Sequence, residues 1–106
     1  MSFEIKEYTE SGHSPFADWF NSLDAVAAAR VDKYVRRLEA GNFGAAKALN
    51  GGIFELRLDF GPGYRVYSGQ HGKTIIILLG GGSKRRRSAD IAAAIERWKK
   101  FKQAKK

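Results

Sequence analysis

The sequence predicts one α+β domain over residues 1–106: an N-terminal strand, a two-helix hairpin, a three-stranded antiparallel meander and a C-terminal helix. Two kinds of periodicity carry this prediction. Short segments alternate apolar and polar residues, and longer segments repeat apolar residues every three or four positions. A chain of 106 residues with 43% hydrophobic content suffices for one core, so we expect no second domain.

The first half of the chain predicts a strand followed by two helices. Residues 3–8 alternate apolar and charged side chains, which is typical of a half-buried strand. Ser14 is a good helix N-cap with a proline after it, and it predicts a short helix that ends near Ser22. Asp24 predicts the N-cap of a longer helix, whose apolar repeat continues until Gly41.

The second half predicts a three-stranded meander. Residues 54–60 alternate in polarity, a Gly-Pro-Gly turn follows at 61–63, and residues 64–67 resume the alternation. Residues 69–72 provide a second turn. The apolar run at 74–79 then predicts a strand that is covered on both faces.

The last helix is expected to begin near Ser88. Ile91, Ile95 and Trp98 follow at helical spacing, so one stripe should pack while the rest faces solvent. Both tryptophans, Trp19 and Trp98, fall at core positions of predicted helices. We therefore interpret them as packing residues and not as platforms for base stacking.

The residue types exclude several kinds of chemistry. The chain has no cysteine, which removes disulfides, thiolate catalysis and zinc-thiolate sites. His13 and His71 are isolated, so we expect metal-free chemistry and no cofactor. The sequence has neither an apolar run of about 18 residues nor a secretory signal pattern, which leads us to expect a cytoplasmic protein.

The formal net charge of +8 is concentrated at the end of the chain. Residues 1–83 carry nine basic and nine acidic residues, whereas residues 84–106 carry ten basic residues against Asp90 and Glu96. Such a cluster suits a polyanion, because lysine and arginine displace counterions from phosphates. A solvated helix end and an acidic protein partner are alternative interpretations.

The polar face of the predicted hairpin gathers charged side chains. With a three-residue turn, Arg57 would face Tyr67 and Asp59 would face Arg65 across the strands. Two guanidinium groups on one surface could hold a phosphate through paired hydrogen bonds. The alternative is a cross-strand ion pair between Asp59 and Arg65 with no further role.

A glycine-rich and then basic segment is expected to leave the apolar strand. Gly80–Gly82 precede Lys84–Arg87, but the Gly-Lys-Ser/Thr triplet of a nucleotide-binding phosphate loop is absent, so we reject nucleotide binding. If the meander is correct, these basic residues lie beside Arg57 and Arg65. Basic residues from two parts of the chain would then converge on one site. The alternative is that the loop is basic only to keep the protein soluble.

Two segments of the sequence resemble a known protein family. Residues 53–67, IFELRLDFGPGYRVY, followed by ILLGGGSK at 77–84, resemble the RelE/ParE superfamily of toxins. More narrowly, they are similar to the addiction module killer proteins near HigB. The resemblance spans nearly the whole chain in length and element order, and its specific part lies within residues 53–91.

The resemblance implies a type II toxin that cleaves messenger RNA on the ribosome, where the 2′-hydroxyl attacks the adjacent phosphate. Carried over by position, it implies catalytic roles for Arg57, Arg65, Lys84 and Arg85. Further RNA contacts are expected at Tyr67, Arg86, Arg87, Lys99 and Lys100.

One departure concerns the proton donor. Several relatives place a tyrosine or histidine where the last helix opens, and this chain has Asp90-Ile91 there. Asp90 is either a substitute donor or a helix N-terminal residue that the helix dipole favours.

The resemblance leaves alternatives open. The same fold serves ParE-like toxins that inhibit DNA gyrase, and a non-catalytic module that binds RNA or an antitoxin is a third possibility. All three imply a cognate helix-turn-helix antitoxin, and the nuclease also implies messenger RNA and the ribosome as partners.

Overall fold

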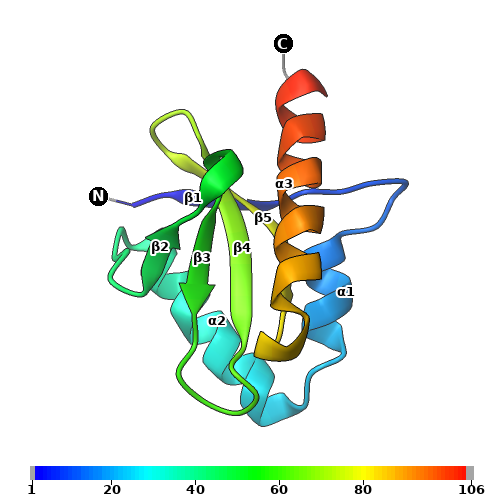
Figure 1. The fold of residues 1–106 in the computed structure, drawn as a ribbon. Coiled ribbons are helices and arrows are strands. Elements are labelled where there is room, and N and C mark those ends of the chain that lie inside the picture. The colour runs from blue at the N-terminus through cyan, green and yellow to red at the C-terminus, as the bar shows by residue number, and fades with distance from the viewer. Residues whose placement is uncertain (1, 105–106) are drawn as a thin grey trace.

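A computed structural model describes residues 2–104 as a five-stranded sheet with helices on both faces (Figure 1). None of the helices formed by these residues is long and apolar enough to cross a membrane. In chain order the elements are β1 (Glu4–Glu7), α1 (Pro15–Asn21), α2 (Ala25–Glu39), β2 (Ala46–Ala48), the 3-10 turn η1 (Asn50–Gly52), β3 (Phe54–Arg57), β4 (Arg65–His71), β5 (Ile75–Gly82), the 3-10 turn η2 (Lys84–Arg86) and α3 (Arg87–Ala104).

The strands lie in the order β1-β5-β4-β3-β2. The predicted antiparallel meander is confirmed as β3-β4-β5, and β1 adds to it in parallel along β5. The prediction of four strands is wrong, because Ala46–Ala48 pairs with Phe54–Leu56 as β2. Its sequence, Ala-Lys-Ala, has too little hydrophobic contrast to be recognised as a strand.

The predicted starts of α1 and α2 are confirmed. The Ser14 hydroxyl accepts a hydrogen bond from the Ala17 amide at 3.0 Å, and the Asp24 carboxylate accepts one from the Ala27 amide at 2.8 Å. Each cap satisfies an amide that the first helical turn leaves without a backbone partner. The polar caps therefore fix where α1 and α2 begin.

Two hydrophobic clusters cover the two faces of the sheet. Ile76 and Leu78 face α1 and α2, while Ile77 and Leu79 face α3. The prediction that the apolar run is covered on both faces is therefore confirmed for β5. Of the four, none is more than 2% exposed.

The prediction that the three glycines leave the last strand is wrong. Gly80, Gly81 and Gly82 pair with Tyr67, Val66 and Arg65 of β4, so β5 runs through them. A Cβ atom on Gly81 would fall on the Trp19 ring, and one on Gly82 would fall on the Asp90 carboxylate. Glycine is needed because α1 and α3 approach the strand closely here.

The predicted hairpin register is also wrong. Arg57 pairs with Arg65, and Glu55 pairs with Tyr67. Strand β3 ends at Arg57, and residues 58–64 form a wider connection closed by a hydrogen bond from the Leu58 amide to the Tyr64 carbonyl at 3.0 Å.

Aromatic packing accounts for this wider connection. The Phe60 and Tyr64 rings meet edge to face at 5.3 Å and pack against the core cluster of α1 and α2. Asp59 therefore does not face Arg65 across the strands, and the carboxylate that pairs with Arg65 is that of Glu55.

Candidate functional site

The candidate site surrounds the carboxylate of Glu55, which is 0% exposed. Arg57 donates from Nε at 3.0 Å, and Arg87 donates from Nε and Nη2 at 2.9 and 3.1 Å. Arg65 Nε lies 3.2 Å from the same carboxylate, and the Tyr67 hydroxyl donates to it at 3.2 Å. We call Glu55 and its three arginines the arginine cluster. Its guanidinium groups carry two positive charges that Glu55 does not neutralise.

The fold brings these side chains together from three elements. Glu55 and Arg57 are two positions apart on β3, so they share one face of the sheet, and Arg65 lies opposite Arg57 on β4. Arg87 is the first residue of α3, which packs over that face. The predicted convergence of basic residues from two parts of the chain is therefore confirmed for Arg57, Arg65 and Arg87.

Burial and the arginines act in opposite directions on Glu55. Removal from water raises the pKa of its carboxyl, whereas hydrogen bonds from Arg87 and Arg57 lower it, and the net shift is downward from 4.5. Glu55 is therefore ionised at neutral pH, and its charge holds the arginines in place.

This shift predicts a pH dependence of stability. Because the folded-state pKa lies below the unfolded value, the contribution of Glu55 is complete above about pH 4.5 and is lost as pH falls through the folded pKa. We expect wild-type protein to lose more unfolding free energy between pH 7 and pH 3 than Glu55→Gln does, as urea unfolding would measure. Equal losses in the two proteins would contradict this.

The expectation that Tyr67 lies exposed for RNA is wrong. Its side chain is 0% exposed and its hydroxyl is bound to Glu55. Burial, followed by the negative charge of Glu55, raises the pKa of the Tyr67 phenol. Tyr67 thus supports the carboxylate and is not positioned to stack on a base.

Arg65 is buried as well, although the hairpin pattern predicted an exposed position. Its Nη1 donates to the Gly63 carbonyl at 2.7 Å, which fixes the guanidinium beside the hairpin connection. A Cβ atom on Gly63 would lie 3.3 Å from that nitrogen and 3.2 Å from Lys84 Cβ. Lys84 therefore stands next to Arg65 at the edge of the cluster.

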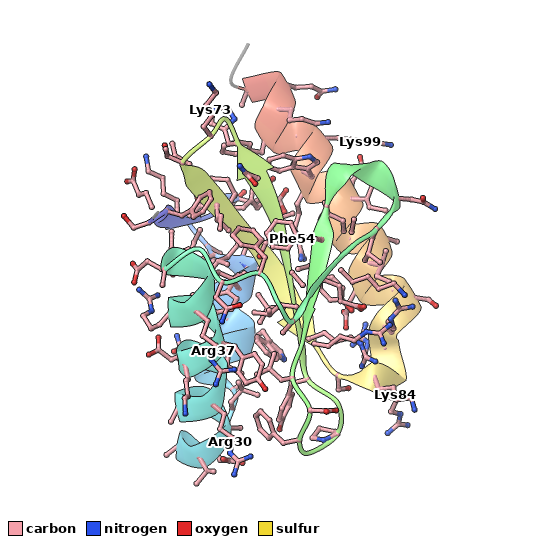
Figure 2. All side chains as sticks on the ribbon, turned by 90° about the vertical axis from the view of Figure 1, so that its left-hand side faces the viewer. Arg30, Arg37, Phe54, Lys73, Lys84 and Lys99 are labelled. Carbon is pink, nitrogen blue, oxygen red and sulfur yellow. The ribbon has the colours of Figure 1, made fainter. Side chains whose placement is uncertain are left out.

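The other predicted basic residues divide into two groups. Lys84, Arg85 and Arg86 are exposed in η2, and with Arg87 they line a shallow pocket at the start of α3. Lys99 lies far along α3 from Lys84 (Figure 2).

Lys100 is also remote from the arginine cluster. Its ammonium forms an exposed ion pair with Glu10 at 3.2 Å. Together with the position of Lys99, this makes the end of α3 a separate basic region and not part of the cluster.

Asp90 lies in the first turn of α3 and is half-buried beside Gly82. Burial raises the pKa of its carboxyl, and the charges of Arg86 and Arg97 oppose that shift. A raised pKa is the direction that a proton donor requires. The position in the first helical turn equally suits interaction with the helix dipole.

Sequence reasoning missed Glu55 as the centre of the site. The signal was present, because the alternation of β3 places this carboxylate on the same face as Arg57. A sheet face that must also receive a helix forces such a charge to find partners. Among residues 2–104 no group of three potential metal ligands is found, and the cluster's own donors suit an anion.

Comparison with known proteins assigns no activity to this arrangement. No family model matches the chain. Over 64 residues the chain is 45% identical to an uncharacterized protein of Haemophilus influenzae, and the match covers 58% of this chain and 65% of that protein. The chain therefore spans slightly less than two thirds of the length of this relative.

Proposed function

We propose that this protein is a RelE/HigB-like toxin of a type II toxin-antitoxin pair that cleaves messenger RNA on the ribosome. The observation that carries the proposal is the arginine cluster, with Lys84 and Arg85 beside it. Guanidinium groups match phosphate oxygens in pairs, and fixed positive charge stabilises the charge that builds up in phosphoryl transfer. The excess of basic residues after position 83 adds attraction for RNA.

In the proposed reaction the 2′-hydroxyl gives its proton to solvent water as its oxygen bonds to the adjacent phosphorus, and the bond to the 5′ oxygen of the next nucleotide breaks. The products are a 2′,3′-cyclic phosphate and a free 5′-hydroxyl. Arg57 holds the phosphate and the buried Arg65 adds positive charge behind it, with Lys84 and Arg85 on its outer side. Asp90 is the candidate to protonate the leaving oxygen, and its raised pKa supports that role.

The test compares two variants that each remove two exposed positive charges. Lys84→Ala/Arg85→Ala alters the site, and Lys33→Ala/Lys73→Ala removes exposed charges from α2 and from the turn before β5. We expect induced wild-type protein to arrest growth and to create new messenger 5′ ends on translated codons. The site variant should lower cleavage about 100-fold, and the control should not.

The same cultures separate the proposal from its alternatives. Arrest with intact messages and altered DNA supercoiling would replace the nuclease with gyrase inhibition. Folded protein that causes no arrest would leave a module that only binds RNA or an antitoxin. Equal cleavage by the two double variants would show that Lys84 and Arg85 take no part in cleavage and would contradict the proposed site.

A further inference from the structure

We propose that Glu55 is a positioning residue: its buried charge holds Arg57, Arg65 and Arg87 in the orientation that phosphoryl transfer requires. This inference rests on the proposed function and assigns the site a residue that touches no substrate. It also adds Arg87 to the set of aligned guanidinium groups.

The contacts of Glu55 support an indirect role. Its two oxygens already accept hydrogen bonds from Arg57, Arg87 and the Tyr67 hydroxyl, and the carboxylate is fully buried. An RNA hydroxyl would have to displace these donors to reach it. The carboxylate therefore acts through the arginines and not on RNA.

Two of the three arginines are held at one side and open at the other. Arg57 and Arg87 use Nε to bind Glu55, and their side chains are 49% and 34% exposed. A guanidinium group anchored through Nε loses rotational freedom before a ligand arrives, which lowers the entropic cost of a fixed geometry. Arg65 is held on two sides, by Glu55 and by the Gly63 carbonyl.

Glu55→Gln distinguishes two ways in which the arginines could act: through their positive charge alone, or through their fixed orientation. The variant removes one negative charge and so raises the net charge of the site by one, so attraction for RNA should stay the same or increase. If orientation matters, the cleavage rate at saturating substrate should fall about 100-fold, since small misplacement of catalytic groups costs that much. We expect the fall in rate without weaker binding of a non-cleavable RNA in which 2′-deoxy nucleotides replace the cleaved positions.

A second variant tests the proposal even if Glu55→Gln does not fold. Arg87→Lys keeps the charge but loses the two-point contact with Glu55, and its partly exposed position makes it easier to accommodate. It should lower the rate at saturation at least tenfold, and Glu55→Asp should recover part of the activity lost in Glu55→Gln. Wild-type rates in both Glu55→Gln and Arg87→Lys would overturn the proposal.

An NMR measurement separates this inference from the proposed function. In wild-type protein the Nε–H groups of Arg57 and Arg87 should give protected signals at neutral pH, and in Glu55→Gln those signals should exchange with water. If wild-type protein cleaves no RNA but shows this change, the nuclease proposal fails while the positioning role of Glu55 stands. Signals that are unprotected in wild-type protein would overturn the positioning role even if RNA is cleaved.

Discussion

Glu55→Ala is expected to lower the unfolding free energy by about 3–5 kcal/mol, because it leaves charged groups without their buried partner. The effect should be largest at Arg65, because its side chain is only 10% exposed and would be left with the Gly63 carbonyl in place of a carboxylate partner. Urea unfolding at neutral pH measures this loss.

Arg57→Ala is the matched control for that experiment. It removes the other end of one of the same ion pairs, but its side chain is 49% exposed, so the cost should stay below about 1 kcal/mol. A loss for Glu55→Ala as small as that of the control would mean that water already solvates the arginines and that Glu55 does not hold them.

Trp98→Ala is expected to cost about 3–5 kcal/mol, as large aromatic-to-alanine changes in cores do. Trp98 is 4% exposed, stacks on Phe101 with ring centroids 5.5 Å apart, and covers Gly69 of β4. Its loss should also loosen α3 and with it Arg87, so the proposed RNA cleavage should fall together with stability. Urea unfolding and the cleavage assay test the two effects.

Lys102→Ala removes the cation beside the Trp98 ring and keeps the ring itself, so it measures the cation contact apart from the burial of Trp98. The Lys102 ammonium lies 5.8 Å from the centre of the Trp98 ring, a contact worth about 0.5–1 kcal/mol at an exposed position. If Trp98→Ala were no more costly than Lys102→Ala, the packing of α3 on the sheet would not depend on this ring.

The helices were predictable because local chemistry sets their ends. Ser14 and Asp24 cap α1 and α2 through bonds to amides three residues away, which a sequence reveals directly. The alternation of β3 likewise placed Arg57 on the correct face of the sheet. Short-range patterns therefore sufficed for the starts of these two helices and for the side of the sheet on which the site lies.

The errors arose where distant segments decide the structure. Gly81 and Gly82 looked like a loop because glycine is disfavoured in strands, yet they are strand residues because Trp19 and Asp90 occupy the space of their side chains. The burial of Arg65 and Tyr67 depends on α3 and on Glu55. Neither dependence is visible from the spacing of residues within one segment.

The parallel pairing of β1 with β5 has a consequence for synthesis of the chain. Glu4–Glu7 lies against residues 75–78, so the first strand of this sheet to be synthesised waits for the last one. During that interval, several seconds at about 5–20 residues per second, the apolar faces of α1 and α2 lack the sheet residues that cover them. Nascent chains stalled before residue 75 should therefore be sensitive to proteases and bind chaperones, whereas full-length chains should resist both.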